Sequence, residues 1–112
     1  MENNQLVKQI EDAHFAEKTC AQITKEFDKV GVSLPIPPPH NNFEHLCELV
    51  SKEVQVMLDQ HPQLLAQLFY SMDLPEYQVN EIMLHASDIA YSLSEKMIIR
   101  AAQKVYLREK FS

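Results

Sequence analysis

Residues 88–109, DIAYSLSEKMIIRAAQKVYLRE, decide the fold of this 112-residue chain. Apolar residues recur in this segment every three or four positions, which is typical of an α-helix. They are Ile89, Ala90, Leu93, Met97, Ile98, Ala101, Ala102, Val105 and Tyr106. The arc that they cover is wide, which predicts a central helix that packs on two sides or is shared with another subunit.

The sign of the charge changes inside this segment. Residues 53–95 contain no Lys or Arg, and residues 1–95 carry five basic and 15 acidic groups, a net charge of −10. Residues 96–112 carry five basic groups and one acidic group, a net charge of +4. Four of these basic residues follow one another at intervals of four, which places them on neighbouring turns of one helix face. This basic stripe consists of Lys96, Arg100, Lys104 and Arg108.

The basic stripe lies roughly opposite Ile98, Ala102 and Tyr106, so we expect it to face solvent or another chain. Cations are favoured near the C-terminal end of any helix, which explains the stripe without a partner. Docking of an acidic partner is the alternative, and anionic lipid or nucleic acid is a weaker one. Leu107 falls inside the basic face and favours docking, because an apolar residue among exposed charges is often an interface contact. The predicted partner-binding residues are Lys96, Arg100, Lys104, Leu107 and Arg108.

Residues 2–30 are predicted to form one helix. An apolar residue recurs in it every three or four positions from Leu6 to Val30 without a polar interruption. Gly31 is expected to end this helix. Residues 31–42, GVSLPIPPPHNN, hold four prolines within five positions, and proline fixes φ and removes an amide donor. We therefore expect an extended, stiff connection there.

Further helices are expected between this connection and the final segment. One begins near Phe43, with Asn41 and Glu44 as a capping box. A short one starts at Pro62, which suits the first turn of a helix. The next is expected after Asp73 as its N-cap. Whether residues 75–109 form one helix or two stays open, because Ser87-Asp88 could cap a new helix or lie inside a long one.

The predicted fold class is all-α: four or five helices in a mostly antiparallel bundle with one extended proline-rich connection. Residues 1–112 form a single domain, with helix 1–30 packed on its own chain or held away as an arm, connection 31–42 and helical core 43–112. The chain contains a single glycine. This excludes the glycine-rich phosphate-binding loops and argues against an all-β fold.

No catalytic motif is present, and we expect a protein that is not an enzyme and holds no cofactor. Cys20 and Cys47 are expected to be buried thiols rather than a disulfide. The weak metal-ligand candidates are Glu11, His14, Glu81 and His85. Glu11 and His14 have the i, i+3 spacing that helical di-iron proteins use, and the site would require all four residues to converge.

The segments LLAQLFYSMDLPE (64–76) and EKMIIRAAQKVYLREKF (95–111) resemble a group of small, uncharacterised bacterial helical proteins. The resemblance covers under half of the chain and implies no activity or catalytic residue. It implies a bacterial protein, and the polar N-terminus and short apolar runs favour a cytoplasmic location without a membrane span. The acidic balance makes nucleic acid an unlikely main partner.

The function expected first is a non-enzymatic protein–protein interaction or regulatory module. The first alternative is a helical bundle that binds a metal or a small ligand. Another is structural self-association, in which a homodimer forms through helix 1–30 and the final helix. Within residues 31–42, Pro35-x-x-Pro38 is also a minimal SH3-type pattern, but a bridging role is favoured because no basic residue lies beside it.

Overall fold

The computed structural model describes residues 2–38 and 41–111, and every regular element in these ranges is a helix. The elements are α1 (Asn3–Gln9), α2 (Ala13–Lys29), α3 (Phe43–Gln60), α4 (Pro62–Ser71), α5 (Glu76–His85) and α6 (Ile89–Phe111). The predicted all-α class is confirmed. The described residues form six helices rather than four or five, because the segment predicted as one helix over residues 2–30 divides and residues 75–109, which the sequence left open, form two helices. The mostly antiparallel order stays a prediction.

The first division falls at residues 10–12, so the prediction of one helix over residues 2–30 is wrong. Asp12 has an extended backbone and is the N-cap of α2. Its carboxylate accepts hydrogen bonds from the amides of His14 (2.8 Å) and Phe15 (3.3 Å). A capping side chain of this kind competes with continuation of the preceding helix. The apolar pattern continues through the break because Ile10, in the turn itself, is fully buried.

The second division separates α5 from α6. The Asp88 carboxylate accepts the amide hydrogen of Tyr91 at 3.1 Å, which is the bond of an N-cap. Ala86, which follows α5, has an extended backbone. Residues 75–109 therefore form two helices, and Ser87-Asp88 lies at the start of the second.

Two predicted caps are displaced from their expected residues. Asn42, not Asn41, caps α3 by accepting the amide hydrogen of His45 at 3.0 Å. Asp73 does not begin α5, because Pro75 is the N-cap. Asp73 instead ends α4 with a φ of 60°, and the amide of Leu74 donates back to the carbonyl of Phe69. This is the helix-ending geometry that glycine usually supplies and that Asp tolerates.

The expected end of the first segment and the extended connection are confirmed in the described residues. Gly31 has a φ of 79° and follows the last turn of α2. Residues 32–38 form no helix, and Leu34 alone among them is buried. The Thr24 hydroxyl donates to the Leu34 carbonyl at 3.0 Å, which ties the connection to α2. Pro39, the last proline of the run, and His40 lie outside the described residues.

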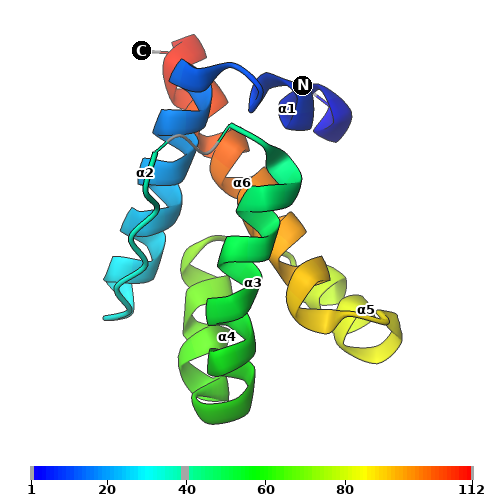
Figure 1. Ribbon diagram of the computed structural model, residues 1–112. Coiled ribbons are helices and arrows are strands. Elements are labelled where there is room, and N and C mark those ends of the chain that lie inside the picture. The colour runs from blue at the N-terminus through cyan, green and yellow to red at the C-terminus, as the bar shows by residue number, and fades with distance from the viewer. Residues whose placement is uncertain (1, 39–40, 112) are drawn as a thin grey trace.

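Helix α6 is central, as its wide apolar arc predicted. It contacts α1, α2, α3 and α5, most extensively α3 and α2 (Figure 1). Ala101 and Ala102 are fully buried in it, and such small side chains let neighbouring helices approach closely. Helices α1 and α2 therefore pack on the α6 of their own chain. In the described residues no helix is both long and apolar enough to span a membrane.

Candidate functional site

Three of the four side chains of the basic stripe, Arg100, Lys104 and Arg108, form hydrogen bonds within the chain. Lys104 Nζ lies 2.7 Å from Glu26 Oε2, and Lys29 Nζ lies 2.7 Å from the other oxygen of the same carboxylate. The Glu26 side chain is fully buried between α2 and α6. Burial alone would raise the pKa of Glu26, but the hydrogen bonds and charges of Lys104 and Lys29 outweigh it and hold that pKa below its usual value.

Two arginines of the stripe are also bonded internally. Arg108 Nη1 donates to the buried Gln22 at 2.9 Å. Arg100 Nε donates to the Met72 carbonyl at 2.9 Å, and its Nη2 lies 3.8 Å from Asp73. These bonds tie α6 to α2 and to the end of α4.

The expectation that the whole stripe faces solvent or another chain is thus wrong for Arg100 and Lys104, whose side chains are 26% and 21% exposed. The reason is that α2 and the end of α4 place polar acceptors against this face of α6. Lys96 is half-buried beside a polar groove of about 490 Å³ that Arg100 also lines. Leu107 is 47% exposed. Docking of an acidic partner on this stripe stays a prediction.

The weak metal-ligand candidates do not converge. Glu11 and His14 are exposed at the corner between α1 and α2, where the Glu11 carbonyl accepts a hydrogen bond from Asn41 at 3.1 Å. Glu81 and His85 lie on α5, with 3.8 Å between Oε1 and Nε2. Across residues 2–38 and 41–111, no three His, Cys, Asp or Glu side chains are grouped so as to hold a metal ion. The convergence that the hypothesis required is therefore not found.

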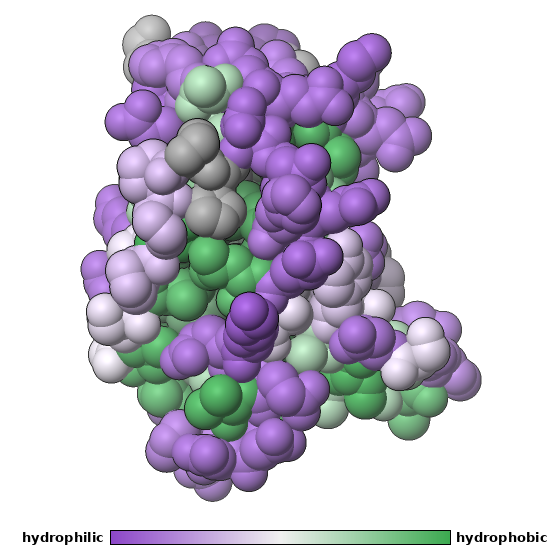
Figure 2. Space-filling view, viewed as in Figure 1, coloured by the Kyte–Doolittle hydropathy of each residue, from purple (hydrophilic) through white to green (hydrophobic). Residues whose placement is uncertain are grey.

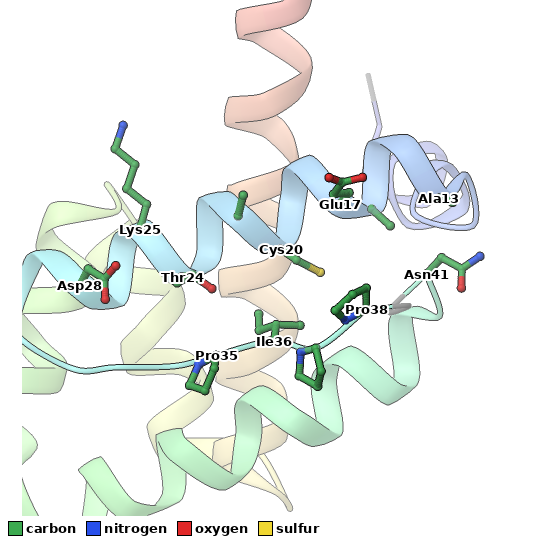
Figure 3. A pocket seen from close by; sticks show the side chains of 13 residues that line it. Ala13, Glu17, Cys20, Thr24, Lys25, Asp28, Pro35, Ile36, Pro38 and Asn41 are labelled. Atoms are coloured by element: carbon green, nitrogen blue, oxygen red, sulfur yellow. The ribbon is translucent and has the colours of Figure 1, made fainter.

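A groove of about 630 Å³ runs between α2 and the proline-rich connection (Figure 3). Small residues of α2, together with Glu17, Lys25 and Asp28, form one wall. The other wall is formed by Pro35, Ile36, Pro37 and Pro38. In Figure 3 the sulfur of Cys20 points toward the connection, whereas the Lys25 ammonium points away from the groove. The sequence analysis missed this groove, although the small residues at positions 13, 16, 20, 21 and 24 were a visible signal for space on one face of α2.

Both cysteines are buried thiols, as predicted. Burial raises the pKa of Cys20 to about 11 and that of Cys47 to about 12. Because the thiolate is the reactive form, a thiol with so high a pKa is a poor nucleophile at neutral pH.

Helix α5 presents an exposed apolar surface. It is the one helix of at least ten residues in the described chain with no buried residue. Tyr77 is 72% exposed, Leu84 76% and Met83 44%, and the carboxylates of Glu76 and Glu81 are exposed beside them. We define these five residues as the α5 surface. Figure 2 shows apolar side chains at the lower right, where α5 projects from the body in Figure 1.

Tyr77 and Leu84 lie on one stripe of α5, because seven residues correspond to almost two full turns. Glu81 lies between them, at i+4 from Tyr77 and i−3 from Leu84. Val79 and Ile82 face the body and are half-buried. The exposed stripe is therefore separate from the side of α5 that holds the helix in place.

Comparisons of this chain with family models, curated proteins and solved structures found no match. The resemblance to small bacterial helical proteins stays a prediction.

Proposed function

We propose that this chain is a non-enzymatic protein-interaction module that docks its partner on the α5 surface. The observation that carries the proposal is the exposure of Tyr77 and Leu84 on a helix that buries none of its residues. Water-exposed apolar side chains of this size, grouped on one face and rimmed by charge, are typical of interaction sites. Aromatic anchors such as Tyr77 often supply much of the binding energy at such sites.

Charge sets the chemistry of the partner. Residues 53–95, which include all of α4 and α5, hold seven acidic residues and no Lys or Arg. A partner that places apolar anchors between Lys or Arg side chains therefore matches the α5 surface in both hydrophobicity and charge. An amphipathic basic helix has this pattern. The α5 surface is preferred to the basic stripe because three of the four stripe cations already have partners within the chain.

The test uses two synthetic helical peptides with the same leucine positions. One has Lys at all of its remaining positions, and the other has Glu at all of them. We expect the Lys peptide to bind at least about tenfold more tightly, and its binding to weaken between 0.05 and 0.5 M salt. Replacing Tyr77 and Leu84 with Ser should cost the Lys peptide about tenfold or more in affinity, since burial of one such side chain contributes about 1.5–3 kcal/mol. Fluorescence anisotropy measures both effects.

The matched control replaces Leu107 and Phe111 with Ser, which removes two exposed apolar residues at the other end of α6. This variant should bind the Lys peptide as the unchanged chain does. Circular dichroism checks that both variants keep their helices. Equal binding of the Lys and Glu peptides, or undiminished binding by the α5 variant, would show that the assignment is wrong.

A small apolar ligand in the groove beside the proline-rich connection is a second candidate function. The volume of about 630 Å³ lies in the range of small-molecule sites, and the walls are mostly alanine, proline and Ile36. An apolar dye whose fluorescence rises on leaving water should bind there. Ala21→Phe would fill the groove and abolish the signal, whereas Ala66→Phe, at an exposed position of α4, would not. Equal signals from both variants would count against the site.

A further inference from the structure

We infer that the partner on the α5 surface is a second copy of this chain, which docks through the last turn of its α6. This inference rests on the proposed function and adds the identity of the partner. It follows from a second exposed apolar surface on the same chain, with the opposite charge.

That second surface lies at the C-terminal end of α6. Leu107 is 47% exposed and Phe111 is 76% exposed, and their i, i+4 spacing places them one above the other on the helix. Arg108 and Lys110 flank them, and Lys110 Nζ lies 5.9 Å from the centre of the Phe111 ring. We define the α6 tip as Leu107, Arg108, Lys110 and Phe111. It is a short apolar stripe flanked by two cations, and Glu109, the acidic residue between them, is paired with Lys18 at 2.8 Å.

The α6 tip and the α5 surface complement each other. Seven large apolar side chains are exposed in the described ranges, and five of these belong to the two surfaces. A contact between the surfaces would therefore cover most of the large apolar side chains that the described part of the chain leaves in water. It would also bring Lys110 and Arg108 toward Glu76 and Glu81, the charges that flank the apolar residues of the α5 surface. The bond of Arg108 to Gln22 does not cancel its charge, because Gln22 is neutral.

One chain cannot make this contact with itself. Helix α5 ends at His85, close to the start of α6 at Ile89, whereas the α6 tip is at the opposite end of a 23-residue helix. Such a helix is about 34 Å long. Figure 1 accordingly shows α5 and the end of α6 at opposite ends of the molecule. The contact is thus head-to-tail between copies, and repetition of it gives open chains or a closed ring.

The test uses two complementary variants. The first replaces Tyr77 and Leu84 with Ser and keeps the α6 tip, and the second replaces Leu107 and Phe111 with Ser and keeps the α5 surface. We expect the unchanged chain to show a mass that rises with concentration in sedimentation velocity up to roughly 1 mM, because a small interface of this kind is weak. Each variant alone should stay monomeric. An equimolar mixture should form a dimer of one variant with the other, since one intact surface of each kind remains.

Several results would overturn the inference. The unchanged chain could remain monomeric, the variant without the α6 tip could still associate, or the mixture could fail to form a dimer. A charge-reversed pair that disturbs no apolar contact, Glu81→Lys and Lys110→Glu, provides a second measurement. Each change alone should weaken association of the chain, because it places like charges opposite each other. A chain that carries both changes, and an equimolar mixture of the two single variants, should both regain association, because opposite charges then meet again.

Failure of this inference is distinguishable from failure of the proposed function. A monomeric chain that still binds the Lys peptide through Tyr77 and Leu84 would keep the docking surface and remove the second copy as its partner. A monomeric chain that binds neither peptide would remove both. Association that requires the α5 surface but not the α6 tip would assign a different part of the chain as the occupant.

Discussion

Replacement of Glu26 with Ala is expected to lower the free energy of unfolding by about 3 kcal/mol. Removal of one partner from a buried ion pair typically costs about 3–5 kcal/mol, because the remaining charge is left without compensation. Here the fully buried carboxylate holds both Lys104 and Lys29 at 2.7 Å. The lower end of the range applies because the Lys29 side chain is 45% exposed and can turn to water. Urea denaturation at pH 7 measures the change.

The matched control is Glu17→Ala, which removes an exposed carboxylate from the same helix. This change should alter the free energy of unfolding by less than about 0.5 kcal/mol. Equal effects from the two substitutions would show that the buried pair does not hold α2 on α6.

The same carboxylate predicts part of the pH dependence of stability. The pKa of Glu26 is lowered in the folded chain from its ordinary value of 4.5. The unfolded chain therefore takes up this proton at a higher pH than the folded chain does, so the contribution of Glu26 is present above about pH 4.5 and is lost as the pH falls through the folded pKa. The difference in unfolding free energy between the unchanged chain and Glu26→Ala should shrink over this window. A difference that is constant from pH 7 to pH 3 would contradict the assignment.

The sequence could predict the buried face of α6 but not the bonds that its basic stripe makes with α2 and with the end of α4. Apolar periodicity is a local property, so residues from Ala90 to Val105 were recognisable as core from their spacing. The Lys104–Glu26 pair joins residues that are 78 positions apart. It depends on how α2 lies against α6, and no spacing within either helix contains that information.

The two missed helix ends have local causes. Asp12 begins α2 inside an apolar pattern that continues without interruption, so the pattern concealed the cap. Asp73 was assigned to the wrong helix because an Asp before Leu-Pro-Glu fits an N-cap, whereas its φ of 60° places it at the end of α4. Asp is one of the few residues besides glycine that tolerate this conformation, and sequence alone does not distinguish the two uses.

The α5 surface was visible in the sequence only in part. The seven-residue separation of Tyr77 and Leu84 is readable, and so is the absence of Lys and Arg over residues 53–95. The exposure of Tyr77 and Leu84 is not readable from the sequence. It depends on which side of α5 packs against the core, and in the structure this is the side that carries Val79 and Ile82. Tyr77 is 72% exposed, on the side of the helix opposite Val79 and Ile82.

Removal of residues 1–42 is expected to abolish the cooperative unfolding of the remaining chain. These residues contribute the buried side chains of Leu6, Ile10, Ile23, Phe27 and Leu34, among others. Burial of one such side chain stabilises by about 1.5–3 kcal/mol, and a domain of this size is stable by only about 5–15 kcal/mol in total. The truncated chain would therefore leave one side of α6 in water without enough stability to compensate. Thermal unfolding followed by circular dichroism would show a broad change in place of a sigmoidal one.

A chain that is cut once within residues 31–42 separates loss of contacts from loss of connection. The contacts of α1 and α2 with α6 do not depend on an unbroken backbone there, because each helix carries its own apolar face and Lys104 still reaches Glu26. The two pieces should thus remain associated and unfold together, at a temperature that depends on concentration because they now have to meet. Cooperative unfolding by residues 43–112 alone would show instead that α3 to α6 form the stable unit and that α1 and α2 are an accessory to it.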